Sequence, residues 1–251
     1  MDRDQLVAYL DEYLHIETFD DSSNNGLQVE GGDEVDRLAL AVDASLASIE
    51  GTIAAQAQML LVHHGLFWGQ PILVTGPHRR RLERLLAAGV SLYAAHLPLD
   101  CHPQVGNNAT LARWLGLQEV APFGNYRGHE IGVEGRLTAP LALAEFVAQV
   151  EGALGETVIK VWPFGSDSVQ RVAIVSGSAA SLLDQVAALG VDVYLTGEVS
   201  HSAYHQAREL GLNVLFAGHY ATETAGLKAL AERLNQRFGL EAVFLDLPTG
   251  A

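Results

Sequence analysis

Cysteine is nearly absent from this chain: Cys101 is the only one among 251 residues. A single cysteine excludes an intrachain disulfide framework, an iron–sulfur cluster and a zinc site built from several thiolates. Any metal ion that this chain binds must therefore have nitrogen and oxygen ligands. Histidine, of which the chain has ten, is the residue to follow.

Positive charge is also scarce, with 15 Lys and Arg against 30 Asp and Glu and a net charge of −15. Nucleic-acid binding depends on clustered cations that face phosphates, so no nucleic-acid partner is expected. The main basic cluster, residues 79–81 with Arg84, falls on a predicted helix. It is either a solvated helix face or a contact to a substrate phosphate.

Long hydrophobic runs are missing as well. No apolar run approaches the ~20 residues that a membrane span needs. The N-terminus, Met1-Asp2-Arg3-Asp4-Gln5, is acidic and helix-like, unlike a secretory signal. We therefore expect a cytoplasmic protein without a membrane partner.

What the chain does have is a regular alternation of strand-like and helix-like segments, with 49% hydrophobic residues. This order predicts the α/β class with mainly parallel sheets. A stretch rich in Gly and Pro, residues 121–135, divides the order into two similar halves. We predict two α/β domains, 1–125 and 126–251. In an alternative arrangement, the C-terminal part of the chain packs with the first domain. The clearest predicted strands are 38–43, 59–62, 90–95, 171–175, 191–195 and 212–217.

Polar side chains follow several of these strands at the point where each strand ends. Functional sites of α/β proteins are usually built at the carboxyl ends of strands. The residues concerned are His63 and His64 after 59–62, His96 and Asp100 after 90–95, Glu198 after 191–195, and His219 and Glu223 after 212–217.

This residue set suits a dinuclear metal site, in which carboxylates bridge or chelate two ions and imidazoles complete each ion. His219 and Glu223 are four residues apart at a predicted helix start, so they share one face. His63 and His64 point to opposite sides of an extended strand. Both can face one site only if the chain turns at Gly65, which a glycine permits.

Each of these residues also has a structural interpretation. The histidine doublet could be structural, Asp100 could cap the next helix, and Glu198 and Glu223 could each oppose a helix dipole. His96, Glu198 and His201 are the candidates for proton transfer or for support of a metal ligand. His201 and His205 are four residues apart on one predicted helix, as in a metal-binding pair, but a supporting role is favoured over direct ligation.

The motifs together resemble the Nif-three-like family, whose members are also called GTP cyclohydrolase 1 type 2 homologues. The resemblance spans nearly the whole chain in the family's order. The matching segments are residues 24–29 (NNGLQV), 61–68 (LVHHGLFW), 96–100 (HLPLD) with 106–108 (GNN), 196–201 (TGEVSH) and 218–223 (GHYATE). One departure is Ser202, where many members have a second histidine.

The resemblance implies two α/β domains with a dinuclear metal site in the cleft between them, and a toroidal homohexamer. By motif, the implied metal ligands are His63, His64, Asp100, His219 and Glu223. It implies two divalent ions per subunit, with zinc, manganese and iron all suited to such ligands.

The leading functional hypothesis is a metal-dependent hydrolase, like a GTP cyclohydrolase 1 type 2, that acts on a small molecule through a metal-activated water. The sequence does not identify the substrate: no P-loop pattern is present. A metal-handling protein that stores, delivers or inserts ions without turnover is the alternative. A ring-shaped interaction scaffold with a structural metal is a second alternative.

Overall fold

The computed structural model describes residues 1–250, and the chain folds as two compact units. Unit 1 consists of Met1–Val105 and Gly226–Leu247. Unit 2 consists of Gly106–Ala225 together with the C-terminal residues from Pro248. Helix α9 (His219–Phe238) begins in unit 2, and its residues from Gly226 belong to unit 1. Within residues 1–250, no helix is long and apolar enough to cross a membrane.

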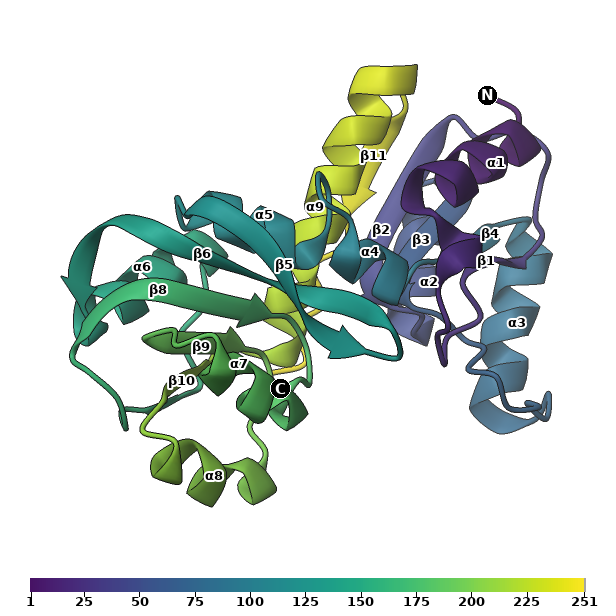
Figure 1. Ribbon diagram of the computed structural model, residues 1–251. Helices are drawn as coiled ribbons and strands as arrows, with labels where there is room; N and C mark the ends of the chain where they lie inside the picture. Colours follow the sequence, from purple (N-terminus) through teal and green to yellow (C-terminus); the bar gives the residue numbers. More distant parts are fainter. Residues whose placement is uncertain (251) are drawn as a thin grey trace. The chain divides into compact units, whose positions relative to one another are not determined.

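Unit 1 is built on a five-stranded sheet in the order β1-β4-β3-β2-β11 (Figure 1). The last four of these strands run parallel, and β1 pairs antiparallel with β4. Strand β3, which carries the histidine doublet, lies between β2 and β4, so the carboxyl ends of all three meet at one edge. The strands are β1 (Gly26–Val29), β2 (Arg37–Asp43), β3 (Met59–His64), β4 (Ser91–Ala94) and β11 (Glu241–Phe244).

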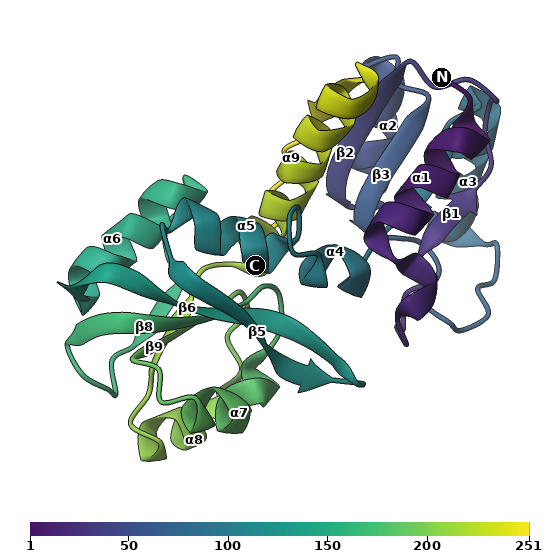
Figure 2. The same cartoon turned by 45° about the horizontal axis from the view of Figure 1, so that its top comes forward.

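Helices cover both faces of this sheet (Figure 2). Ile49 of α2 and Leu85 of α3 pack with Leu60 and Leu92 in one hydrophobic cluster. On the opposite face, the hydroxyl of Tyr93 donates to Asp11 of α1 at 2.8 Å. The end of α9 joins the same face, since Arg233 Nε donates to the Tyr9 hydroxyl at 3.2 Å. The helices of this unit are α1 (Arg3–Leu14), η1 (Ile16–Thr18), α2 (Leu46–Ala54), α3 (Gly76–Ala88) and α4 (Leu97–Cys101).

Unit 2 has a six-stranded sheet in the order β5-β6-β8-β9-β10-β7. Its centre, β8-β9-β10, is parallel, whereas β5, β6 and β7 are added in antiparallel pairings. The carboxyl ends of β8, β9 and β10 again share one edge, next to the start of α9 (Figure 1). The strands are β5 (Gln118–Tyr126), β6 (His129–Ala142), β7 (Lys160–Trp162), β8 (Ser168–Val175), β9 (Val193–Thr196) and β10 (Asn213–Phe216).

The core of unit 2 lies between its sheet and helices α5 and α6, with Leu111, Phe146, Ile174 and Leu195 in one cluster. Helices α7 and α8 cover the other face (Figure 2). There the buried Tyr194 hydroxyl donates to the Ala179 carbonyl at 2.8 Å. The helices of this unit are α5 (Asn107–Trp114), α6 (Leu143–Leu154), η2 (Ala180–Leu182), α7 (Leu183–Ala188), η3 (His201–Ala203) and α8 (Tyr204–Glu209).

The α/β class and the two sheets of the sequence-based prediction are confirmed. The expected boundary near residue 125 falls inside β5, and the units change over between Val105 and Gly106 instead. The Gly- and Pro-rich stretch folds as the β5–β6 hairpin, because Arg127 and Gly128 both adopt positive φ, 51° and 87°, between the paired Tyr126 and His129. Two such residues form the type I′ turn that closes antiparallel strands.

The side chain of Asn108 in α5 connects this helix to β6 and to the end of β8, so its removal tests the packing of unit 2. The side chain is 1% exposed. Its Nδ2 donates to the Ile131 carbonyl at 2.6 Å, and its Oδ1 accepts from the Ser176 amide at 2.7 Å.

We expect Asn108→Ala to lower the free energy of unfolding by at least about 2 kcal/mol, because two buried backbone groups lose their partner. Chemical denaturation followed by circular dichroism measures this. The exposed Asn125, whose side chain makes no hydrogen bond within residues 1–250, supplies the control. Asn125→Ala should stay within about 0.5 kcal/mol of the parent. Equal effects of both changes would contradict this role of Asn108.

Candidate metal centre

Three histidines of unit 1 gather at the carboxyl ends of β3 and β4. His63 and His64 are the last two residues of β3, and His96 follows β4. Each offers one ring nitrogen, and these three nitrogens all lie within 4.8 Å of one another. The His63 ring centroid is 4.8 Å from that of His64 and 5.0 Å from that of His96. This is a spacing at which one metal ion could contact more than one imidazole.

In each of these histidines, Nδ1 makes a hydrogen bond to an oxygen. His63 Nδ1 lies 2.9 Å from the Ala95 carbonyl, and His64 Nδ1 lies 2.9 Å from Asp43 Oδ1. His96 Nδ1 lies 2.9 Å from Asp21 Oδ1. A carbonyl or carboxylate oxygen can only accept, so the neutral ring carries its proton on Nδ1 and its lone pair on Nε2. Metal-binding histidines show this same arrangement.

Asp100 adds a carboxylate to the same group. The side chain is nearly buried, and its Oδ2 lies 3.5 Å from His63 Nε2. Asp100 lies on the short helix α4, which follows β4 and has Pro98 in its first turn. Proline is compatible with the first turn of a helix, where its missing N–H is not needed. Helix α4 therefore turns Asp100 back toward β3.

Asp21 was not singled out from the sequence, yet it holds His96 in place. Besides the His96 ring, its carboxylate accepts from the backbone amides of Leu97 at 3.0 Å and Ser23 at 3.1 Å, and from Asn25 Nδ2 at 2.9 Å. Burial opposes the charged form of Asp21. The hydrogen bond and charge of His96, with the bonds from Asn25 and Ser23, outweigh burial and hold the pKa of Asp21 well below its usual range.

Asn24 and Gln28 hold the loop that follows the histidine doublet. Gln28 Oε1 accepts from the Leu66 amide at 2.7 Å, and Asn24 Oδ1 accepts from the Gly69 amide at 2.7 Å. A Cβ at Gly65 would overlap the Gln28 amide, so a larger residue there would displace the side chain that binds the Leu66 amide. Strand β3 ends at His64, and Gly65 does not adopt a positive φ.

Unit 2 carries a second donor group at the start of α9. His219 is the first residue of this helix, and its Nε2 lies 3.1 Å from Glu223 Oε1, one turn later. His219 Nδ1 lies 3.1 Å from Glu198 Oε2, which follows β9. The bonds to Glu223 and Glu198 raise the pKa of His219 to about 9 despite burial. Glu198 therefore orients His219 as Asp43 orients His64.

The loop after β8 fits closely around this pair. Gly177 has φ 65°, and a Cβ there would overlap the Glu223 carboxylate. Its amide donates to Thr222 Oγ1 at 3.0 Å. Gly177 thus lets the end of β8 lie directly against the first turn of α9, where Glu223 is 3% exposed.

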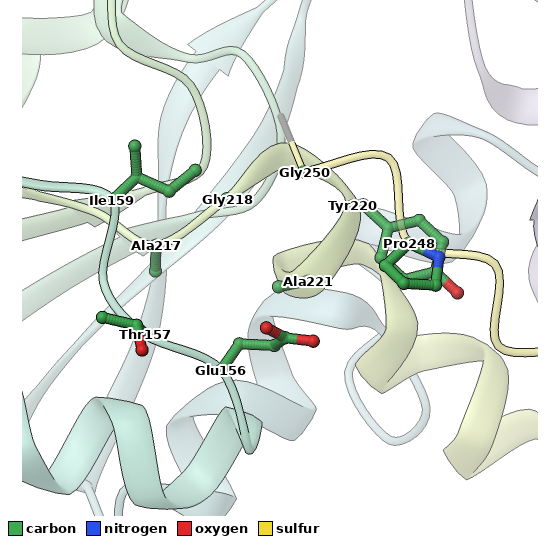
Figure 3. Close-up of a pocket in the computed structure, with 9 residues that line it drawn as sticks. All are labelled: Glu156, Thr157, Ile159, Ala217, Gly218, Tyr220, Ala221, Pro248 and Gly250. Atoms are coloured by element: carbon green, nitrogen blue, oxygen red, sulfur yellow. The ribbon is translucent and has the colours of Figure 1, made fainter.

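A small pocket of about 210 Å³ lies beside this helix start (Figure 3). It contains neither His219 nor Glu223, so it is separate from the donor pair. Its lining residues are Glu156, Thr157, Ile159, Ala217, Gly218, Tyr220, Ala221, Pro248 and Gly250.

The remaining polar residues have other surroundings. His201 is exposed on η3 and makes no side-chain hydrogen bond or ion pair within residues 1–250, so its proton-transfer role stays a prediction. In His102 the roles of the two ring nitrogens are reversed relative to His63, His64, His96 and His219. Its Nε2 faces the Tyr13 carbonyl at 3.0 Å, and its Nδ1 accepts from the Gln104 and Val105 amides. Burial lowers the pKa of His102 to about 4. Burial also raises the pKa of the Cys101 thiol.

The contrast between His63 and His102 can be measured directly. In metal-free protein, two-bond ¹⁵N–¹H correlation spectra should show neutral His63 with its proton on Nδ1 and neutral His102 with its proton on Nε2. The reason is that each proton faces a carbonyl oxygen, which can only accept. The opposite tautomer at His63 would contradict the proposed orientation of its Nε2 lone pair.

Comparison with known proteins agrees with this architecture. The profile of the family described as Duf34/NIF3 (NGG1p interacting factor 3) matches residues 1–250. A Deinococcus radiodurans protein named "GTP cyclohydrolase 1 type 2 homolog" is 47% identical over 248 residues, which cover 99% of this chain and 94% of that protein. A Pyrococcus horikoshii protein of the same name is 46% identical, with both chains covered completely. The crystal structure of TTHA1606 from Thermus thermophilus superposes with a TM-score of 0.92 at 47% identity, again over both whole chains. The resemblance seen in the motifs is thus confirmed, and the chain belongs to the Duf34/NIF3 family.

Proposed function

We propose that this chain is a metal-dependent hydrolase that binds two divalent ions through His63, His64, Asp100, His219 and Glu223. The observation that carries the proposal is the common orientation of the histidines. In His63, His64 and His219, Nδ1 is bonded to an oxygen, and in His63 and His219 the Nε2 faces a carboxylate at 3.5 Å and 3.1 Å. Pairs of imidazole nitrogen and carboxylate oxygen are the ligands that zinc, manganese and iron accept.

The single cysteine does not compete with this ligand set. Burial raises the pKa of the Cys101 thiol and so disfavours the thiolate, the form in which a cysteine binds metals. The donors are therefore all nitrogen and oxygen, which fits the three metals named above and leaves the choice among them to metal analysis.

When bound, divalent ions would lower the pKa of a water molecule and polarise the group under attack. The chain's own residues would hold the ligands and move protons. Asp43 and Glu198 orient His64 and His219 through their Nδ1 atoms. His96, whose Nδ1 lies 2.9 Å from Asp21 Oδ1, is the favoured proton carrier, since this hydrogen bond fixes the orientation of its ring. Glu198 and His201 are the other candidates.

The name of these relatives supports hydrolysis of a ring, because it describes them as homologues of a GTP cyclohydrolase. The two alternative functions, a metal-handling protein and a ring-shaped scaffold, would use the same metal ligands but would not catalyse a reaction. A metal-handling protein would release its ions to a partner, and a scaffold would lose its assembly on chelation. We also propose the toroidal homohexamer implied by the family resemblance, which the native mass in solution tests.

Metal content is the first test. We expect the metal-free protein to take up two Mn²⁺ per chain and to keep them through dialysis. If both ions share one dinuclear centre, where such ions lie about 3.5–4 Å apart, their electron paramagnetic resonance spectrum should show exchange coupling. His64→Ala and Glu223→Ala should each weaken manganese binding by at least about 100-fold, more than the loss of a supporting residue. His78→Ala, which removes a histidine outside both donor groups, is the control. Unchanged uptake in both variants would refute the ligand assignment.

Turnover is the second test. The metal-loaded protein is assayed against nucleotides, esters and cyclic amides, with hydrolysis followed by mass spectrometry. Activity should fall at least about 100-fold in His64→Ala and in Glu223→Ala, and should persist in His78→Ala. Stable binding of two ions without turnover of any of these compounds would favour the metal-handling alternative. Turnover that survives both ligand variants would refute a metal-dependent reaction.

A further inference from the structure

A recess of about 430 Å³ opens beside His64 in unit 1. Its walls include Asp43, Ser45, His64, Trp68 and Arg81. The volume lies in the range of small-molecule sites, which run from about 300 to 1,000 Å³. The recess therefore offers space for a small molecule in direct contact with one candidate metal ligand.

Arg81 is unlike the other arginines of the basic cluster on α3. Arg84 forms a two-pronged ion pair with Glu50 at 2.6 and 2.8 Å, and Arg79 lies 3.6 Å from Glu83. Within residues 1–250, neither Arg80 nor Arg81 has an ion pair or a side-chain hydrogen bond. Arg80 is exposed and stands outside the recess, whereas Arg81 is half-buried in its wall.

The walls of the recess themselves offer Arg81 little competition for an incoming anion. The carboxylate on the recess wall, Asp43, already accepts from His64 Nδ1 at 2.9 Å. The Ser45 hydroxyl accepts from the Ser48 amide at the start of α2. Arg81 is thus the cation of this wall that is available to an incoming anion, and guanidinium groups bind phosphate and carboxylate through two parallel hydrogen bonds.

Trp68 supplies a flat apolar surface in the same recess. Its Nε1 donates to the Gly65 carbonyl at 3.0 Å, which fixes the indole. The ring centroid lies 5.8 Å from that of His64 and 5.1 Å from that of His96. A planar ring that packs against Trp68 would therefore lie next to the candidate metal ligand His64 and the candidate proton carrier His96.

We infer that the substrate of this site is a small molecule with a flat ring and an oxyanion, a phosphate or a carboxylate, and that Arg81 binds the oxyanion while Trp68 packs against the ring. This inference rests on the proposed function for the reaction, but the binding step can be tested separately. Of the two interpretations of the basic cluster, a contact to a substrate anion then applies to Arg81. A solvated helix face applies to Arg79 and Arg84.

The test measures binding of phenyl phosphate, benzoate and phenol by calorimetry, with metal-loaded protein and with chelated protein whose fold is checked by circular dichroism. Phenyl phosphate or benzoate should bind and phenol should not. Arg81→Gln should weaken binding of the anion by at least about tenfold, the effect of one lost charged hydrogen bond. Arg81→Lys should fall between Arg81→Gln and the parent. Arg80→Gln, the neighbouring cation outside the recess, should change binding less than about twofold.

Equal losses in Arg80→Gln and Arg81→Gln would overturn the inference, because they would show general electrostatic attraction. Phenol binding as tightly as phenyl phosphate, or no binding of any probe, would overturn it as well. If the protein retains metal and Arg81→Gln has no effect, only this inference fails. If the protein binds no metal but the anion still depends on Arg81, the inference stands and the proposed function fails.

Discussion

The hydrogen bond from a histidine Nδ1 to a backbone or carboxylate oxygen is the interaction on which both donor groups depend. It occurs at His63, His64, His96 and His219. An imidazole can rotate about its side-chain bonds, and without such a bond neither its orientation nor its tautomer is defined. The oxygens come from the ends of neighbouring strands or from loops beside them, so the parallel sheets set the direction of the ligands.

The polar segment after α1 has a structural role that its composition alone does not disclose. Asp21 and Asn25 bind the His96 loop, and Asn24 and Gln28 bind the loop after His64. The segment thus connects the ends of β3 and β4 from outside. A loop that carries candidate ligands needs such fixed partners, because a ligand placed by backbone alone would have too much freedom to bind a metal tightly.

The charged side chains around the histidines also have defined partners, with Arg81 as the exception. The chain is strongly acidic, yet the carboxylates near the histidines are engaged as hydrogen-bond acceptors, and Arg81 stands beside them without a carboxylate of its own. A recess with an available cation and a fixed aromatic wall suits an anionic ring compound better than a neutral one.

The sequence by itself determined the alternation of strands and helices, the polar residues at strand ends, and the pair His219 and Glu223. These follow from local periodicity and from the four-residue spacing of a helix. It did not disclose the β5–β6 hairpin, because the Arg127–Gly128 turn resembles a linker in composition. Only the tertiary structure decided which oxygen faces each histidine, which residues fix the loops, and which arginine enters the recess. These contacts connect residues that are far apart in the sequence, such as Asp21 and His96, which are 75 positions apart. Contacts at that separation depend on how the strands are ordered in the sheet, and no local pattern specifies that order.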